Sequence, residues 1–315
     1  MRRLSVLVGA LAGLVALGGV VSPARGQGTT DPYAPPPGYY DLAQGKTGQD
    51  LRQALNDIID NHTRRTYDQV WAILAEADAD PANPNHVLTF YKNSSVPASD
   101  HGLWNREHTW PTSYGFPDDT RCNYPYTDAH HLHAEDGGYN SSRGNKPFDW
   151  CLRDCAEKSV YKVPGAANRT KGAGATGTWE VWSGRRGDVA RALFYMDVRY
   201  EGGTHQDGCA EPDLMLTDDR SLMVTVGENV TGTAHMGILT TLLAWDREDG
   251  AGSRAKQRNE VVFAAQGNRN PFIDHPEWAC SVRGVCATEE PTAPITVTMT
   301  VTPTLAATVL PSSMR

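Results

Sequence analysis

The six cysteines constrain this fold most, because the start of the chain indicates that they meet an oxidising compartment. The first residues, MRRLSVLVGALAGLVALGGVVSPARG, place Arg2 and Arg3 before an apolar run that ends in small residues. This order is typical of a secretory signal peptide, so we expect residues 1–26 to be removed rather than kept as an anchor. In an exported chain, an even set of cysteines predicts disulfides.

The spacing of these cysteines leaves most of their pairing open. They are Cys122, Cys151, Cys155, Cys209, Cys280 and Cys286. Only Cys280 and Cys286 form an evident local loop. The sequence contains no CxxC pair, which disfavours a zinc site built from cysteines.

The charge of the chain does not by itself indicate its partners. The formal net charge is −8, and it falls to −11 without the three arginines of residues 1–26. An acidic chain is unusual for a nucleic-acid binder, but a whole-chain charge does not set the local field. From Ser141 to Glu201, eleven Lys and Arg residues stand against seven Asp and Glu residues. The middle of the chain is therefore locally basic.

The pattern along the chain predicts one mixed domain between two irregular ends. Residues 27–38 are rich in Pro and Gly and predict a flexible lead-in. Residues 39–287 predict a single, mostly helical α+β domain. Residues 288–315 are rich in Thr and Pro and predict a disordered linker. No segment after the signal peptide is apolar and long enough to predict a membrane span.

Apolar residues at helical spacing predict helices in both halves of the domain. The segments are Leu51–His62, Val70–Leu74, a helix capped by Asp188 that runs to Tyr200, and Met236–Leu243. The segment HVLTFYK (His86–Lys92) predicts a strand.

Between these helices, residues 93–147 are irregular and carry most of the reactive side chains. Two segments stand out, WNREHTWPTSYG (Trp104–Gly115) and DAHHLHAEDGGYNSSRGNKPF (Asp128–Phe148). They combine histidines, carboxylates, an asparagine and arginines. Hydrolysis of a phosphodiester needs a base, a cation and a donor that holds the phosphate, and these segments supply all three kinds of group.

The histidines His130, His131 and His133 allow a different interpretation, a zinc hydrolase. Their spacing disfavours it, because no pair lies at i,i+4 on a helix, and His130 would point away from the other two on a strand. We expect these three histidines to be hydrogen-bonded core residues.

The order of the motifs resembles the bacterial endonuclease I family of ββα-metal, or His-Me finger, nucleases. It consists of Arg106-Glu107-His108, Trp110-Pro111, Asp128-x-His130-x-Leu132 and Asn140-x-x-Arg143-x-Asn145. The segments TGQDLRQALNDIIDNH, YDQVWAILAEADAD, RRGDVARALFYMDVRY and QGNRNPFIDHPEW also resemble this family, in the same order. The resemblance extends from about Gly38 to Trp278 and implies a small ββα-metal motif inside the domain.

The resemblance implies a role for each matching residue. His108 matches the general base, and an ordinary imidazole suits that task at neutral pH. Glu107 and Asn140 match metal ligands. Two oxygen ligands with one charge suit Mg²⁺, with Ca²⁺ or Mn²⁺ as alternatives, and are a poor zinc site.

Glu107 and His108 also make a geometric demand, because both adjacent residues must serve one site. Adjacent strand residues point to opposite faces, so a strand that carries Glu107 and His108 must twist or end there. If residues 136–144 are helical, Asn140 and Arg143 share one face at i,i+3.

The phosphate-binding arginine is the least determined part of the resemblance. The family uses an arginine between the His and Asn segments, and Arg121 is the only one there. Arg121 is therefore predicted as catalytic, with a solvated loop charge as the alternative. Arg143 is predicted to contact substrate, or to be a structural ion-pair partner, and Arg106 is also predicted to bind substrate.

The sequence thus predicts a secreted, extracellular or periplasmic, endonuclease with little sequence preference. We expect it to act on DNA, RNA or both as a monomer and, by the resemblance, to leave 5′-phosphorylated ends. The alternatives are a secreted zinc hydrolase and a disulfide-stapled extracellular binding module.

Overall fold

The computed structural model describes residues 31–225 and 232–286. The predicted signal peptide and the predicted tail at 288–315 lie outside these residues. The described residues from Pro35 onward form one structural unit.

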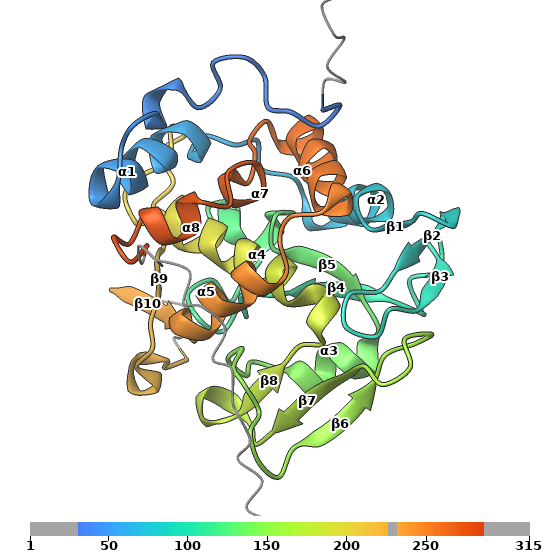
Figure 1. The fold of residues 1–315 in the computed structure, drawn as a ribbon. Helices are drawn as coiled ribbons and strands as arrows, with labels where there is room; N and C mark the ends of the chain where they lie inside the picture. The colour runs from blue at the N-terminus through green and yellow to red at the C-terminus, as the bar shows by residue number, and fades with distance from the viewer. Residues whose placement is uncertain (1–30, 226–231, 287–315) are drawn as a thin grey trace, which may run out of the picture. The chain divides into compact units, whose positions relative to one another are not determined.

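Helices and short strands alternate through the unit that begins at Pro35, which confirms the predicted α+β class (Figure 1). The α-helices are α1 (Gly48–Ile59), α2 (Tyr67–Ala77), α3 (Gly137–Arg143), α4 (Arg186–Arg199), α5 (Leu239–Glu248), α6 (Ser253–Gln266), α7 (Pro271–Asp274) and α8 (Trp278–Ser281). The strands are β1 (Ala79–Asp80), β2 (Asn83–Leu88), β3 (Ser95–Pro97), β4 (Asn105–His108), β5 (Leu132–Glu135), β6 (Ala156–Ser159), β7 (Ala167–Lys171), β8 (Thr178–Glu180), β9 (Asp213–Leu216) and β10 (Thr233–Met236). A 3-10 helix, η2 (Tyr124–Thr127), lies between β4 and β5.

The strands form small separate sheets. β1, β2 and β3 form an antiparallel sheet in that order, as do β6, β7 and β8. β4 pairs antiparallel with β5, and β9 pairs parallel with β10. Because sheets this small cannot form a core alone, helix packing supplies most of the interior.

Helix α4 is the core helix of the domain and is buried along almost its whole length. It packs against α1, α5, α7 and β9, so its apolar residues occur on all sides rather than on one stripe. Its arginines are buried with partners, since Arg191 pairs with Asp246 and Arg199 with Glu211. The sequence predicted only one apolar face for this helix, whereas the structure covers all of them.

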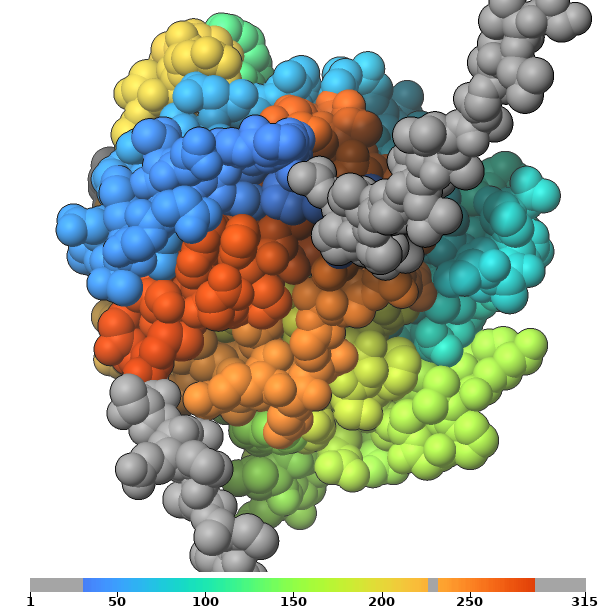
Figure 2. Space-filling view, turned by 45° about the horizontal axis from the view of Figure 1, so that its top comes forward, coloured from blue at the N-terminus to red at the C-terminus, as the bar shows by residue number. Residues whose placement is uncertain are grey.

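The two ends of the domain lie side by side on one face, where the segments coloured blue and red meet (Figure 2). The Tyr40 hydroxyl donates a hydrogen bond of 2.7 Å to Asp274. The Tyr40 ring also packs edge-on against Trp278. The first and last parts of the region of family resemblance therefore contact each other within one domain.

All six cysteines form disulfides, as the export signal predicted. The local pair Cys280–Cys286 is confirmed. The pair Cys122–Cys209 joins positions 87 residues apart, which ties the segment before η2 to the segment before β9.

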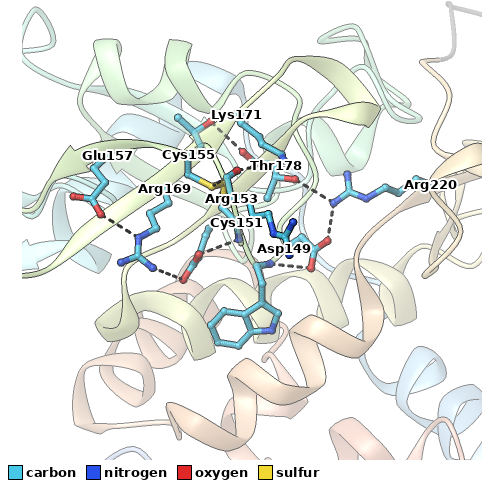
Figure 3. Close-up of a disulfide and its surroundings, with 12 residues drawn as sticks. Asp149, Cys151, Arg153, Cys155, Glu157, Arg169, Lys171, Thr178 and Arg220 are labelled. Atoms are coloured by element: carbon cyan, nitrogen blue, oxygen red, sulfur yellow. Dashed lines mark hydrogen bonds and ion pairs between the residues drawn. A yellow bond between two sulfur atoms is a disulfide. The ribbon is translucent and has the colours of Figure 1, made fainter.

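The third disulfide, Cys151–Cys155, closes a second local loop that the sequence did not single out (Figure 3). It lies beside the β6–β8 sheet. The Cys151 amide donates to Glu180, and Lys171 donates to the Arg153 carbonyl. These bonds hold the loop against the sheet.

The strand predicted at His86–Lys92 lies earlier in the structure, as β2. After Leu88 the chain turns back toward β3. The buried carboxylate of Glu135 accepts hydrogen bonds from the amides of Tyr91 and Lys92. The side chain of Glu135, which is distant in the sequence, therefore accepts the hydrogen bonds that these amides would donate to a neighbouring strand if β2 were longer.

The predicted start of the central helix is wrong by three residues, because its N-cap is Arg185 rather than Asp188. α4 begins at Arg186, and Asp188 lies in its first turn rather than at its cap. The Asp188 carboxylate pairs with the side chains of Arg185 and Arg191. Ion pairing with these arginines therefore replaces the predicted contact with helix amides.

The predicted helix at Met236–Leu243 begins later, at Leu239. Met236 belongs to β10, whose partner is Leu216 of β9. An apolar residue at this position fits a helix or a strand equally well, and pairing with a distant strand decides between them.

Candidate active site

A cavity of about 240 Å³ lies between the end of β4, the loop that follows it and α3. Because β4 pairs with β5 and α3 follows β5 directly, the cavity belongs to one ββα unit. Its lining residues are Arg106, Glu107, His108, Pro111, Thr112, Ser113, Asn140, Arg143, Gly144 and Asn145. The structure therefore brings five of the six predicted site residues around one opening.

The end of strand β4 explains how the adjacent residues Glu107 and His108 reach the same cavity. His108 is the last residue of the strand, as the geometric demand on these two residues predicted. The buried Arg143 guanidinium of α3 donates to the backbone carbonyls of His108 and Thr109. Pro111, which follows, cannot donate to a strand ladder. The strand therefore stops against α3, and both side chains border the space beyond it.

His108 presents one ring nitrogen that has no protein partner. Its Nε2 lies 2.9 Å from the carbonyl oxygen of Tyr126 in η2. A carbonyl only accepts hydrogen bonds, so Nε2 carries the proton and Nδ1 carries the lone pair. Nδ1 makes no hydrogen bond to any described residue. Burial, together with the neighbouring His131, lowers the pKa of His108 to about 3, so the ring is neutral at pH 7 and is not the imidazole of ordinary pKa that the sequence analysis expected.

Glu107 is a buried carboxylate with one oxygen engaged. Its Oε1 accepts a 2.8 Å hydrogen bond from the Tyr91 hydroxyl and lies 3.2 Å from Nη1 of Arg143. Oε2 makes no hydrogen bond to the described residues. Burial raises the pKa of Glu107 to about 7, against the opposing effects of Arg143 and Tyr91. A cation at Oε2 would stabilise the charged form.

Asn140 reaches the cavity from a short helix that depends on its cap. The Asp136 side chain accepts hydrogen bonds from the amides of Gly138 and Tyr139, which begins α3 despite its glycines. The helix predicted over residues 136–144 is thus confirmed. Asn140 Nδ2 donates a 2.9 Å hydrogen bond to Asn105 Oδ1. This bond assigns the amide nitrogen to Asn105 and leaves the Asn140 oxygen available as a ligand.

Arg106 contributes a half-buried cation at the edge of the cavity. Its guanidinium carbon lies 3.3 Å from the Tyr67 ring centroid and 4.2 Å from the Trp71 centroid. Nη1 also donates to the Tyr67 carbonyl. No carboxylate of the described residues lies within ion-pair distance. Aromatic faces therefore hold Arg106 in place while its charge stays uncompensated.

Residues 47–277 match the endonuclease I family. An extracellular ribonuclease of Bacillus amyloliquefaciens is 42% identical over 268 residues, which are 83% of each chain. An extracellular ribonuclease of Bacillus subtilis strain 168 is 43% identical over 253 residues, 79% of each chain. The chain belongs to the endonuclease I family.

This endonuclease I family member is a nuclease that hydrolyses phosphodiester bonds, and it is secreted, in agreement with its three disulfides. The match overturns the alternative of a binding module without catalytic activity. Across residues 31–225 and 232–286, no helix has the length and apolarity needed to span a membrane.

The structure does not bring Arg121 to the cavity. Its side chain is 77% exposed and lies 3.4 Å from Asp207. The neighbouring Cys122 is fixed by its disulfide to Cys209, which holds this segment beside the loop that carries Asp207. Of the three predicted arginines, only Arg106 and Arg143 therefore line the cavity, and Arg143 is already paired with Glu107.

The cluster predicted as an alternative zinc site is dispersed in the core. His130 and His131 each bond a separate backbone carbonyl, those of Asn268 and Pro125, while the His133 ring stacks on Phe90. Within the described residues, no group of three potential metal ligands is assembled. All three histidines are buried in the core as predicted, but only His130 and His131 make the expected hydrogen bonds, since neither ring nitrogen of His133 has a hydrogen-bond partner among the described residues.

Three contacts around the cavity were missed by sequence reasoning. They involve the Tyr91 hydroxyl on Glu107, the Tyr126 carbonyl on His108 and the Asn105 side chain on Asn140. Asn105 adjoins the Arg106-Glu107-His108 triplet, so its position carried a signal. Tyr91 lies in a turn before β3, and Tyr126 acts through its backbone carbonyl. The residue type therefore did not predict either contact.

A larger cavity lies elsewhere in the described residues. It has a volume of about 500 Å³ and is lined largely by α5, α8 and the Cys280–Cys286 loop. None of the predicted site residues borders it. The chemistry of the lining, rather than size, identifies the smaller cavity as the candidate active site.

Proposed function

We propose that this nuclease cleaves both RNA and DNA with little sequence preference, using His108 as general base and one magnesium-class ion held by Glu107 and Asn140. The observation that carries the proposal is the unpartnered Nδ1 of His108 at the cavity that Glu107 and Asn140 also line. The names of the two Bacillus relatives support RNA as a substrate.

The ligand set fits a magnesium-class ion. Glu107 Oε2 and the Asn140 amide oxygen offer two oxygen ligands and a single negative charge. Mg²⁺ prefers oxygen ligands and keeps several waters, whereas zinc sites use more nitrogen or sulfur. When bound, such an ion supplies positive charge that stabilises the phosphate oxygens and the leaving oxygen.

His108 moves the proton in this proposal. Nδ1 takes a proton from water while Nε2–H stays bonded to the Tyr126 carbonyl, which fixes the ring and stabilises the imidazolium that forms. The water oxygen forms a bond to phosphorus as the bond from phosphorus to the 3′-oxygen breaks. The departing 3′-oxygen takes a proton from solvent water, so the products are a 5′-phosphate and a 3′-hydroxyl.

The two arginines that line the cavity have different roles in this proposal. Arg106 has no carboxylate partner and would donate to a phosphate oxygen. Arg143 holds the end of β4 and the Glu107 carboxylate, so its role is to position those two groups. The exposed Arg121 would act at most on distant parts of a long substrate.

Digestion of supercoiled DNA and total RNA by the secreted protein tests this assignment. We expect cleavage of both with Mg²⁺ and none with EDTA. Calorimetric titration with Mn²⁺ should show one binding site that is lost in Glu107→Gln and retained in the control His86→Ala, whose histidine lies outside the cavity. Undiminished Mn²⁺ binding by Glu107→Gln would place the ion elsewhere, and cleavage in EDTA would remove the ion from the reaction.

A further inference from the structure

A run of stacked groups leads from the cavity onto the protein surface. It begins at Arg106, continues through Trp71 of α2 and ends at His101 in the loop before β4. The His101 and Trp71 rings are nearly parallel, at 9°, with centroids 3.8 Å apart. We call these two rings the His101–Trp71 stack. It connects the catalytic cavity with a solvent-exposed imidazole.

The two partners of Trp71 must lie on opposite faces of its indole. Arg106 lies 4.2 Å from the Trp71 centroid and His101 lies 3.8 Å from it. Two planar groups cannot both occupy the same face of one ring at such distances. The guanidinium, the indole and the imidazole therefore form a single column, with His101 outermost.

Buried and partly buried neighbours hold the His101 ring in position. Trp104 is buried and meets both rings edge-on, at 4.6 Å from Trp71 and 5.4 Å from His101. The Trp104 indole donates to the Ala98 carbonyl. A capping box of Thr66 starts the helix that carries Trp71. Trp71 and Trp104 therefore hold the His101 ring at the surface.

The outer face of His101 has no protein neighbour that explains its position. The ring makes no hydrogen bond to any described residue, and within the described part of the chain its ring contacts are those with Trp71 and Trp104. A stacked imidazole offers a flat, polarisable face to solvent. Nucleobases stack on such faces in proteins that bind single strands.

We propose that an unpaired base of the substrate stacks on the outer face of His101 while a neighbouring phosphate occupies the cavity. The inference rests on the proposed function, because the phosphate in the cavity places the adjoining nucleotide next to Arg106. A base within a duplex has both faces covered by its neighbours. Single-stranded RNA or DNA is therefore the substrate class that this surface fits.

Binding of two single strands of equal length and charge tests the proposal. One carries bases, and the other is an abasic sugar-phosphate strand. In EDTA, wild-type protein should bind the first about tenfold more tightly, the effect expected of one base–aromatic stack. His101→Ala should bring this ratio close to one, whereas His101→Phe, which keeps an aromatic face, should preserve it.

The outcomes separate this inference from the proposed chemistry. Thermal unfolding of both variants at the wild-type temperature would show that the fold is intact. A ratio that His101→Ala leaves unchanged, or a wild-type ratio near one, would overturn the stacking proposal. Failure of the wild-type protein to cleave any strand with Mg²⁺ would instead overturn the catalytic assignment, because the binding ratio does not depend on cleavage.

Discussion

His108 and His131 occupy similar positions but differ in what lies beside them. They belong to the facing segments of the β4–β5 pair, with ring centroids 5.4 Å apart. Each uses Nε2 to bond a carbonyl of η2, that of Tyr126 for His108 and that of Pro125 for His131. Nδ1 of His131 is buried without a partner, whereas Nδ1 of His108 belongs to a residue that lines the cavity.

The comparison teaches that the residue type and its first hydrogen bond do not make a catalytic histidine. Burial lowers the pKa of both rings and keeps them neutral at pH 7. Only His108 stands at the end of a strand, next to a carboxylate with an unengaged oxygen. His108 therefore differs from His131 in lining the cavity that Glu107 also borders.

The largest effect that this comparison predicts is on the rate of cleavage. His108→Ala should lower the cleavage rate by about 10²–10⁴-fold, the usual contribution of a general base. His131→Asn should retain most of the activity and lose about 1–3 kcal/mol of stability, since it disturbs a buried hydrogen bond. Initial cleavage rates and urea unfolding of both variants measure this. A rate loss of equal size in His131→Asn would contradict the prediction that only His108 contributes to cleavage.

Removal of Arg143 should affect stability more than any other single cavity change. Arg143→Met leaves the buried Glu107 carboxylate without its ion-pair partner, which costs about 3–5 kcal/mol in comparable buried pairs. The double variant with Glu107→Gln should recover part of that loss, because no uncompensated charge remains. Urea unfolding of the three variants forms the double-mutant cycle. A stability loss in the double variant equal to the sum of the two single losses would show that Arg143 and Glu107 are not coupled.

Acid should act on the buried histidines through the unfolded state. Burial lowers the pKa of His130 to about 4, so the unfolded chain binds the proton at higher pH than the folded one. The stability associated with neutral His130 is present above pH 6.5 and is lost as the pH falls from 6.5 toward 4. The loss is on the order of 3 kcal/mol. His130→Gln should flatten the pH dependence of the unfolding free energy in this window, and an unchanged slope would refute the assignment.

The smallest effect concerns the helix that carries Asn140. Asp136→Ala removes the cap of α3 and should cost about 1 kcal/mol of stability. Because α3 also positions Asn140, cation affinity should fall while His108 remains in place. Thermal unfolding and Mn²⁺ titration measure the two effects, with Asp136→Asn as the variant that keeps the cap. A large loss of stability without a change in cation affinity would separate α3 from the ion.

The local parts of the site could be predicted from the sequence. The triplet Arg106-Glu107-His108 and the residues Asn140 and Arg143 lie in two short segments whose order is typical of the family. The conflict between adjacent strand faces also predicted that the strand ends near His108. The helix of Asn140 was expected only through the resemblance to the ββα motif, and the Asp136 cap explains why it forms despite its glycines.

The parts that depend on distant segments could not be predicted. Tyr91 reaches Glu107 from a turn that Glu135 holds in place, and neither contact has a local signature. Met236 fits a helix until β9 is placed beside it. The exposure of Arg121 follows from the Cys122–Cys209 disulfide, whose pairing the spacing left open. Tertiary partners decided each of these cases.

Chemical rescue tests the central claim most directly, because it asks whether an imidazole is needed at the position of His108. Cleavage of a short RNA by His108→Ala is measured with Mg²⁺ over increasing imidazole concentration, with Asn140→Ala as the control. We predict that His108→Ala is nearly inactive and that imidazole restores part of its rate, while Asn140→Ala does not respond. Wild-type rates in His108→Ala without imidazole would contradict the assignment of His108 as the base.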